Sequence, residues 1–397
     1  MDVLVSSEHR FDRTPDGRVW TQSLYAYSFW TRYLAVFDRV RVLARVRDIP
    51  TAQSDWQRAD GQAVSLAAVP YFLGPKQYLM RLRRVRRAAR SAVNRSDAVI
   101  LRLSSPIAAT IVPLMRRTGH PYGVEVVGDP YDVFAPGAVH HPLRPFCRWW
   151  FPRQLRRQCA AACAAAYVTD YALQRRYPPA LDVLSTSYSS VELPNAAFAP
   201  TSRPIREAPR AFTLVTIGSL EQMYKAPDVL IDAVSHCVRQ GLDLSLILIG
   251  DGKHRPEMEA RATAAGLGER VCFRGQITAG SAVRTQLDQS DLFVLPSRTE
   301  GLPRAMIEAM ARALPCIGTR IGGIPELLPS DDLVPPNDVA ALAQKIRDVL
   351  TDPARMARMS ASNLEHARGY HEDVLSTRRS EFYRYVQERT EAWLKHS

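Results

Sequence analysis

The chain has 397 residues, 46% hydrophobic and 23% charged, a balance typical of folded globular proteins that excludes an intrinsically disordered chain. This length exceeds what one ordinary core accommodates, so we expect two domains. The formal net charge is +12, yet residues 1–200 hold 27 Lys and Arg against 15 Asp and Glu, whereas residues 201–397 hold 25 of each. The positive excess therefore lies in the first half, where nucleic acid, an anionic membrane or an anionic acceptor would each be a compatible partner.

The sequence contains no run of about 18 uncharged apolar residues. Its first residues, Met1–Val5, enter a strand pattern and lack the basic and apolar regions of a secretory signal. We therefore expect a cytoplasmic protein without a membrane span. Peripheral contact with the inner face of the plasma membrane stays an open alternative.

Short apolar stretches alternate in the first half with segments long enough for helices, which indicates a parallel, helix-covered sheet. The predicted strands are Val3–Ser6, Val40–Val46, Ala98–Leu103, Gly123–Val127 and Ala166–Thr169.

Between the second and third of these strands, Lys76–Arg95 carries eight basic residues and no acidic one. As a helix it has an apolar stripe, formed by Tyr78, Leu82, Val85, Ala89 and Ala92. The opposite side carries Arg83, Arg84, Arg87 and Arg90. One interpretation is a surface helix whose stripe packs on the sheet. The other is that the arginines dock on anionic lipid or hold a phosphorylated or lipid-linked acceptor.

The second half repeats the alternation with nearly continuous apolar runs, as strands buried on both faces require. These predicted strands are Phe212–Gly218, Leu244–Gly250, Val271–Gly275, Leu292–Pro296 and Cys316–Thr319. Prolines 194, 200, 204 and 209 precede them and suit an interdomain linker. We expect two Rossmann-like domains, 1–204 and 205–397, with a final helix at about 371–394 whose packing the sequence leaves open.

Three features of the second half indicate a site for a diphosphate. A strand leads into Gly218-Ser219 and then to Lys225 before a helix, so backbone N–H groups, a helix N-terminus and a cation converge there. A second strand leads into Gly250-Asp251, at the strand end where ligands of open α/β sheets bind, although a plain tight turn is equally compatible.

The third feature is the segment from Ser297 through Gly301-Leu302-Pro303 to the helix at Arg304–Ala311. Glu300 precedes that helix and Glu308 lies inside it, so both carboxylates can accept hydrogen bonds from the hydroxyls of one ligand. Because the neighbours of Glu308 in the helix are apolar, its carboxylate is expected to have a partner.

Glu300 and Glu308, with seven residues between them and followed by Ile317-Gly318-Thr319 and Gly322–Glu326, resemble the signature of glycosyltransferase family 4. The resemblance covers the C-terminal half well and the N-terminal half in outline. It implies the GT-B fold, in which two Rossmann-like domains face each other across a cleft. It also implies transfer of a sugar from a nucleotide-diphosphate sugar to an acceptor hydroxyl, with retention of configuration at the sugar. The resemblance places this reaction in glycan, glycolipid or glycosylated-metabolite biosynthesis, and it implies that the N-terminal domain binds the acceptor.

The resemblance also implies roles for single residues. Glu300 would hold sugar hydroxyls, Glu308 the ribose and Lys225 the diphosphate. Gly218 would allow close approach of the phosphate. The base would lie beside the backbone of Gly275, Gln276 and Ile277, and Ser297, Gly301, Leu302 and Pro303 would complete the cradle.

The chain departs from the family pattern at the phosphate and on the acceptor side. The family commonly has an arginine after the glycine at 218, where this chain has Ser219, so Gln222 or the helix start would take over that contact. The family often has a histidine where this chain has Gly128, which leaves Asp129 as the acceptor-side candidate. His9, in the loop after the first strand, is a further candidate.

No two aspartates in the chain bracket a single residue, so the carboxylate pair of metal-dependent glycosyltransferases is absent from the sequence. We expect no metal and no cofactor, and Lys225 with backbone dipoles would stabilise the leaving diphosphate. The alternatives are a sugar-nucleotide epimerase or a phosphorylase on the same fold, and a basic nucleic-acid-binding protein. The last is disfavoured because the phosphate-type loops lie in the half without excess charge.

Overall fold

The computed structural model describes residues 1–23, 25–135, 142–204 and 211–396. The chain folds into two compact units: Met1–Gly128 with Phe151–Tyr188 and Ser376–Ser397, and Asp129–Trp150 with Ser189–Leu375. The expected ranges 1–204 and 205–397 differ from this division, because 129–150 and 189–204 group with the second unit and 376–397 with the first. The boundary predicted near residue 205 falls on residues 205–210, outside the described part of the chain, and stays a prediction.

The described residues of the first unit form a nine-stranded sheet. Its parallel strands follow the order β5-β3-β1-β6-β7-β8-β9, and β2 and β4 pair antiparallel beyond them at the end of β1. The bounds are β1 Val3–Arg13, β2 Val19–Thr21, β3 Val40–Asp48, β4 Gln57–Arg58, β5 Val64–Pro70, β6 Ala98–Leu103, β7 Gly123–Val126, β8 Ala164–Tyr167 and β9 Leu184–Ser187. The five strands predicted here are confirmed as elements, although β1 continues seven residues further than expected and β8 begins two residues earlier.

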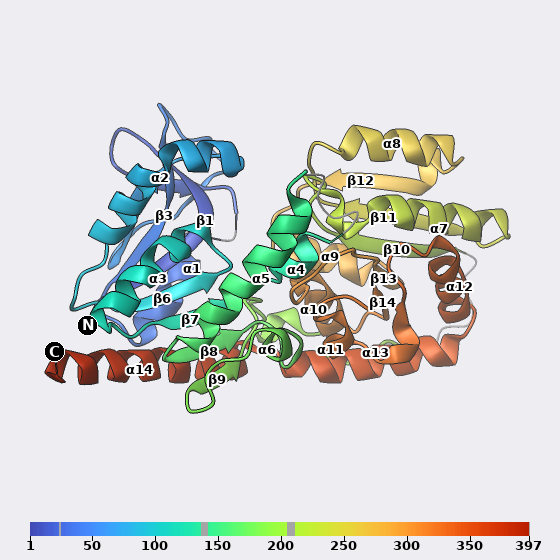
Figure 1. The fold of residues 1–397 in the computed structure, drawn as a ribbon. Coiled ribbons are helices and arrows are strands. Elements are labelled where there is room, and N and C mark those ends of the chain that lie inside the picture. The colour runs from blue at the N-terminus through green and yellow to red at the C-terminus, as the bar shows by residue number, and fades with distance from the viewer. Residues whose placement is uncertain (24, 136–141, 205–210, 397) are drawn as a thin grey trace. The chain divides into compact units, whose positions relative to one another are not determined.

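Helices α2 (Gly74–Ser91) and α3 (Pro106–Thr118) cover one face of this sheet (Figure 1). Val85 and Ala89 of α2 and Ile107 and Ile111 of α3 are fully buried in the core that the helices share with β1, β3 and β6. The other helical elements are α1 Tyr27–Thr31, the 3-10 helix η1 Arg32–Ala35, α5 Arg144–Ala160, which begins in the second unit and ends in the first, and α6 Ala172–Arg176.

The last helix is α14 (Glu372–His396), and from Ser376 onward it belongs to the first unit, where it packs against β7. A Cβ atom at Gly123 would lie 2.6 Å from Cγ2 of Val386 and 2.9 Å from Cζ of Phe382. Because this glycine has no side chain, the helix lies directly on the strand. The packing that the sequence left open is thus decided by an interaction more than 250 residues away in the chain.

A buried carboxylate, Glu125 of β7, joins the sheet to the elements on this face. Its Oε2 pairs with Arg102 of β6 and accepts a 2.9 Å hydrogen bond from Tyr33, and its Oε1 accepts bonds of 2.8 Å from Tyr188 and 3.3 Å from Tyr383 of α14. Burial raises the pKa of all three tyrosines, so their hydroxyls stay protonated and donate. The network ties α14 to the sheet by polar contacts as well as by packing.

The described residues of the second unit form a six-stranded, wholly parallel sheet of order β12-β11-β10-β13-β14-β15 (Figure 1). The bounds are β10 Phe212–Ile217, β11 Leu244–Ile249, β12 Val271–Gly275, β13 Leu292–Leu295, β14 Cys316–Thr319 and β15 Leu333–Val334. The first five confirm the predicted strands to within one residue. Numbered within the unit, the order is 3-2-1-4-5-6, that of the Rossmann fold.

Helices cover this second sheet. Helices α7 (Pro227–Arg239), α8 (Arg255–Ala264) and α12 (Val339–Leu350) share one core with Leu214, Leu246 and Leu292 of the strands. The remaining helical elements are η2 Asn195–Ala197, η3 Met223–Lys225, α4 Pro130–Val133, η4 Gly268–Arg270, α9 Ser281–Asp288, α10 Arg304–Ala311, α11 Ile324–Leu327, η5 Ser330–Asp332 and α13 Pro353–Arg368. Among the described residues, none of the helices combines the length and the apolar character needed to cross a bilayer.

Replacing Glu125 with alanine leaves the buried Arg102 without its partner and three hydroxyls without an acceptor. We expect this variant to lose about 3–5 kcal/mol of stability and the unfolding temperature of the first unit to drop in calorimetry. The control is Asp48→Ala, which removes the exposed ion pair with Arg13 in the same sheet and should leave the unfolding temperature near that of wild type. Equal unfolding temperatures for the two variants would contradict a structural role of the network.

Candidate active site

The predicted donor-site residues gather where the winding of the second sheet reverses. Strands β10 and β13 pair, with Leu214 beside Leu292, although β11 and β12 come between them in the chain. The chain leaves β10 towards α7, and it leaves β13 towards α10, which lies outside the core that α7 shares with the strands. Ligands of open α/β sheets bind outside the carboxyl ends at such a reversal. Gly218 follows β10 and Ser297 follows β13 at this point.

An ion pair between Lys225 and Glu300 forms the centre of the site. Nζ of Lys225 contacts Oε1 of Glu300, and the hydroxyl of Ser297 donates a 2.7 Å hydrogen bond to the same oxygen. Both charged side chains are largely buried, with 17% of Lys225 and 8% of Glu300 exposed. The structure thus brings together three of the predicted residues from segments 75 residues apart in the chain.

The turn after β10 places the lysine. Lys225 ends the 3-10 helix η3, and Ala226 follows in the left-handed region with a φ of 51°. The stem of Lys225 passes over Gly218, where a Cβ would lie 2.8 Å from Cγ of the lysine. Gly218 therefore admits the lysine stem, in addition to the access for phosphate that the resemblance implies.

Arg298, which no sequence motif singles out, connects η3 to the loop after β13. Its guanidinium donates to both carboxylate oxygens of Asp228, at 2.9 and 2.7 Å, and to the carbonyl of Met223 at 2.7 Å. Its backbone N–H donates to the carbonyl of Tyr224 at 2.7 Å. Bidentate arginine–carboxylate pairs have a fixed geometry, so this clamp holds the two halves of the ion pair in register. The sequence shows Asp228 in the first turn of a helix and Arg298 at a strand end, but nothing in it indicates that the two side chains pair.

The loop that carries Glu300 rests on the turn after β14. Gly322 has a φ of +55°, and a Cβ there would lie 2.0 Å from the carbonyl oxygen of Glu300. The N–H of Gly323 donates to the carbonyl of Gly301 at 2.7 Å, and the hydroxyl of Thr319 donates to the carbonyl of Ser297 at 2.7 Å. Only glycine at 322 allows this close backbone contact.

Glu308 lies half-buried in the second turn of α10. Within the described ranges its carboxylate makes no hydrogen bond or ion pair, so the partner expected from the sequence is not supplied by those residues. Burial raises its pKa, and Arg304 and Arg284 oppose that effect. The oxygens of this carboxylate can therefore accept hydrogen bonds from a ligand.

The Gly250-Asp251 turn supports the turn after β10. The carbonyl of Asp251 accepts the N–H of Leu220 at 2.9 Å, and the hydroxyl of Ser219 accepts the N–H of Glu221 at 3.1 Å. The Asp251 carboxylate pairs with Arg255 at 3.1 Å. Of the interpretations left open for this turn, these contacts support a structural one.

The other donor-site candidates lie around this centre. Gly275 ends β12 and accepts the N–H of Gly250 at 2.8 Å, followed by the exposed Gln276 and the half-buried Ile277. Gln222 is exposed beside η3, while Leu302 and Pro303 are buried in front of α10. The proposed contacts of these residues with base or phosphate stay predictions.

The two acceptor-side candidates have structural partners. Asp129 caps α4 by accepting the N–H of Tyr131 at 2.8 Å. His9 lies within β1 and not in a loop after it as predicted, and its Nε2 lies 2.8 Å from the hydroxyl of Thr21 and 3.1 Å from that of Ser23. Burial, with Arg10 and Arg45 nearby, lowers the pKa of His9 to about 4, so the ring is neutral at physiological pH. Catalytic roles for both residues stay predictions.

Comparisons with known proteins find glycosyltransferases. Residues 211–352, which contain its centre, match the family described as Glycosyl transferases group 1. Protein CapJ of Staphylococcus aureus is 24% identical over 348 residues, covering 87% of this chain and 86% of CapJ. The 2-deoxystreptamine glucosyltransferase of Streptomyces kanamyceticus is 28% identical over 269 residues, covering 64% of this chain and 65% of that enzyme.

Solved glycosyltransferase structures share the fold along the whole chain. Sucrose-phosphate synthase of Thermosynechococcus elongatus superposes with a TM-score of 0.71 at 17% identity, covering 97% of this chain and 99% of the other. WaaG, a glycosyltransferase of lipopolysaccharide biosynthesis, gives 0.65 at 16% identity, covering 97% and 98%. The two α/β units thus have the GT-B fold, and the match of residues 211–352 to the group 1 glycosyltransferases, with the glycosyltransferase relatives, supports a glycosyltransferase of the family 4 type.

Proposed function

We propose that this glycosyltransferase moves a sugar from a nucleoside-diphosphate sugar to an acceptor hydroxyl with retention and without a metal, in glycan or glycolipid biosynthesis. The observation that carries the proposal is the Lys225–Glu300–Ser297 cluster at the winding reversal, with the unpartnered carboxylate of Glu308 nearby. In this proposal Lys225 binds the diphosphate of the donor. Glu300, released from Lys225 by the diphosphate, binds the sugar, and Glu308 binds the ribose.

In the proposed reaction, the diphosphate replaces Glu300 as the partner of Lys225. Glu300 then accepts hydrogen bonds from sugar hydroxyls. The bond between the anomeric carbon and the phosphate oxygen breaks, and its electron pair stays on the diphosphate, whose charge Lys225 stabilises. The acceptor hydroxyl attacks the anomeric carbon from the same face, and its proton passes to the leaving phosphate oxygen.

Uridine and guanosine nucleotides are the first donors to test. Anabaena HepE, which matches at a TM-score of 0.63 with 16% identity over 100% of both chains, was solved with UDP-glucose. A Corynebacterium glutamicum relative, 32% identical over 36% of this chain, is a GDP-mannose-dependent mannosyltransferase. Neither name decides the base for this protein.

A second proposal, peripheral contact with an anionic membrane, rests on α2. Val85, Ala89 and Ala92 of the predicted stripe are buried on the sheet, and Tyr78 and Leu82 are half-buried. The opposite side is exposed and consists of Arg83, Arg84, Arg87 and Arg90. Since the stripe packs on the core, it cannot also enter a bilayer, and the proposed contact is electrostatic and reversible. Leu79 and Met80, 66% and 78% exposed near the start of the helix, would add shallow apolar contact.

The first prediction concerns Lys225 and Glu300. Lys225→Ala should weaken UDP or GDP binding at least about tenfold, because a charge-assisted contact contributes about 1.5–3 kcal/mol. Glu300→Gln should keep or tighten nucleotide binding, since it removes the competing carboxylate, while lowering turnover of the nucleotide sugar. Calorimetry and a turnover assay measure the two effects, with Lys345→Ala as a control of equal charge loss. If Lys225→Ala and Lys345→Ala bind nucleotide equally well, the assignment is wrong.

The second prediction concerns pH. Glu308 must be ionised to accept two ribose hydroxyl bonds, and its pKa lies above the ordinary value of 4.5. Nucleotide affinity should therefore be fully present above the raised pKa and fall as the pH drops through it, up to about tenfold per unit. Glu308→Gln should bind more weakly but lack this component, so the ratio of wild-type to variant affinity should shrink from about pH 8 to about pH 5. A constant ratio would contradict the role.

The third prediction concerns α2. Wild type should co-sediment with vesicles of phosphatidylcholine and phosphatidylserine at low salt and dissociate at high salt, because each arginine near the surface contributes about 1 kcal/mol. Changing Arg83, Arg84, Arg87 and Arg90 to glutamine should abolish binding. The control changes four exposed basic residues elsewhere, Arg239, Arg384, Arg389 and Lys395, and should bind like wild type. Equal binding by both variants would show that only net charge matters.

A further inference from the structure

A surface pocket of about 590 Å³ lies in the first unit, apart from all residues assigned above. Its lining comes from the loop between β1 and β2 and from the segment at 50–56, which follows β3. Trp20 and Trp56 line it together with Thr14, Asp16, Gln53 and Ser54. The volume falls within the range of about 300–1,000 Å³ that is usual for small-ligand sites.

The pocket lies on the ligand-binding edge of the first sheet. β1 and β3 are neighbouring parallel strands that end at Arg13 and Asp48, so the loops after them extend from the same edge. A bulge between Ser6 and Arg10 interrupts the pairing of β1 with β3, which resumes from Arg10 to Arg13. Ligands of open α/β sheets bind outside these carboxyl ends.

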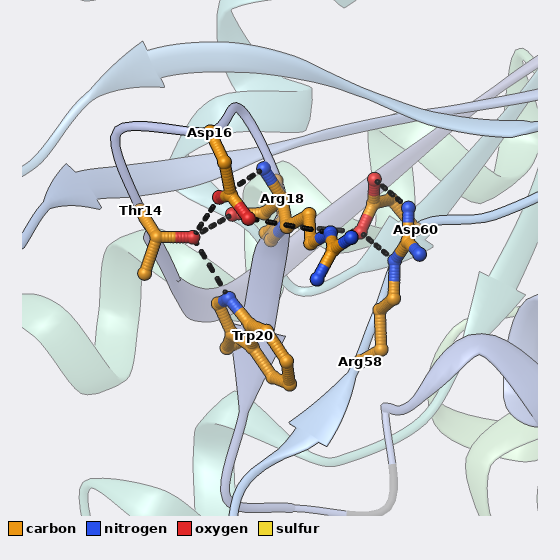
Figure 2. A network of polar contacts seen from close by, with 7 residues as sticks. Thr14, Asp16, Arg18, Trp20, Arg58 and Asp60 are labelled. Carbon is orange, nitrogen blue, oxygen red and sulfur yellow. Dashed lines mark hydrogen bonds and ion pairs between the residues drawn. The ribbon is translucent and has the colours of Figure 1, made fainter. Parts of the chain in front are cut away.

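A network of hydrogen bonds holds one wall of the pocket in place (Figure 2). The hydroxyl of Thr14 accepts a 3.0 Å bond from Nε1 of Trp20 and donates to Asp16 at 2.5 Å, as Figure 2 shows. The backbone closes the same loop through bonds from Thr14 N–H to the Arg18 carbonyl, 3.0 Å, and from Gly17 N–H to the Thr14 carbonyl, 2.9 Å. The ring of Trp20 is therefore oriented before any ligand arrives.

The other tryptophan has an unused donor. Nε1 of Trp56 is buried, and none of the described residues accepts its hydrogen. A buried indole N–H usually finds an acceptor, because leaving it unpaired costs free energy. Because protein atoms cover this N–H, a ligand in the pocket would contact Trp56 through the exposed part of its ring.

Charge in and around the pocket is neutralised by pairing. Of the described lining residues only Asp16 is charged, and its carboxylate lies 3.2 Å from Nε of Arg18. Three further arginines near the hairpin of β1 and β2 are paired with aspartates: Arg13 with Asp48, Arg47 with Asp12 and Arg58 with Asp60. A site for nucleic acid or anionic lipid needs unpaired cations, so neither fits this surface.

We propose that this pocket binds a neutral oligosaccharide, with pyranose faces against Trp20 and Trp56 and hydroxyls bonded to Asp16, Gln53 and Ser54. Aromatic rings cover the apolar C–H faces of sugars, while carboxylate, amide and hydroxyl groups match their hydroxyls. That the oligosaccharide is the acceptor glycan of the enzyme rests on the proposed function. The binding itself does not.

The test is direct binding of defined sugars to the full-length protein, measured by calorimetry and by saturation-transfer NMR. The probes are maltohexaose, cellohexaose, chitohexaose and α-1,6-linked mannohexaose, with a hyaluronan hexasaccharide as the anionic comparison. Wild type should bind at least one neutral probe and prefer it to hyaluronan. Trp56→Ala should weaken that binding at least about tenfold. Trp56→Phe, which keeps an aromatic ring of smaller area, should fall between them.

The control is Trp150→Ala, which removes an exposed tryptophan of α5 and should bind sugar like wild type. The affinity for UDP and GDP should be the same in wild type and in the three variants, Trp56→Ala, Trp56→Phe and Trp150→Ala. Failure of wild type to bind any neutral probe, preference for hyaluronan, or unchanged binding by Trp56→Ala would overturn the proposal. Absence of UDP and GDP binding in wild type would instead contradict the donor site and leave the sugar result standing.

Discussion

The active site depends on one topological constraint, the reversal of winding between β10 and β13 in a sheet whose strands are all parallel. Parallel neighbours need crossover connections, so each strand here is followed by a helix that covers a face of the sheet. Where the winding reverses, the chain leaves the two strands in different directions, and their carboxyl ends stay uncovered. Lys225 and Glu300 come from the two segments that leave the sheet there, which is why residues 75 apart form one ion pair.

The first unit has the same reversal but fills it differently. There β1 and β6 are neighbours, with Val3 beside Ala98. Oε1 of Glu8 accepts a 2.5 Å bond from the hydroxyl of Ser105 and a 3.0 Å bond from the N–H of Ile107, at the start of α3. An internal carboxylate thus already occupies the positive end of that helix. In the second unit the internal carboxylate, Glu300, instead faces Lys225, and in the proposed reaction a diphosphate replaces this carboxylate.

The uneven charge of the chain resolves into two different surfaces of the first unit. Around the hairpin of β1 and β2, three arginines are paired with aspartates, and two tryptophans and polar groups, of which only Asp16 is charged, line the pocket. On α2 the arginines are exposed, and the helix has no acidic residue. Net charge alone could not separate a surface suited to neutral sugar from one suited to anionic lipid, because it does not show which charges are paired.

The sequence by itself predicted most of the strands and the residues of the candidate donor site. The apolar runs of the second half predicted β10 to β14 to within one residue, because strands buried on both faces must be continuously apolar. The positions of Lys225 and Glu300 after two strand ends indicated one site, and the structure brings these two side chains together. Strands β2, β4 and β15 were missed because they are too short to show a pattern, and β5 and β9 because they are only partly buried.

Only the tertiary structure decided which distant side chains meet. The clamp of Arg298 on Asp228 joins residues 70 apart, and the burial of Glu125 with Arg102 depends on β6 and β7 being neighbours. The return of α14 to the first unit depends on Gly123, which has no side chain to hold the helix away. Local sequence encodes burial and turns through periodicity and residue type, whereas these pairings follow from strand order and from the approach of backbones, which no local pattern carries.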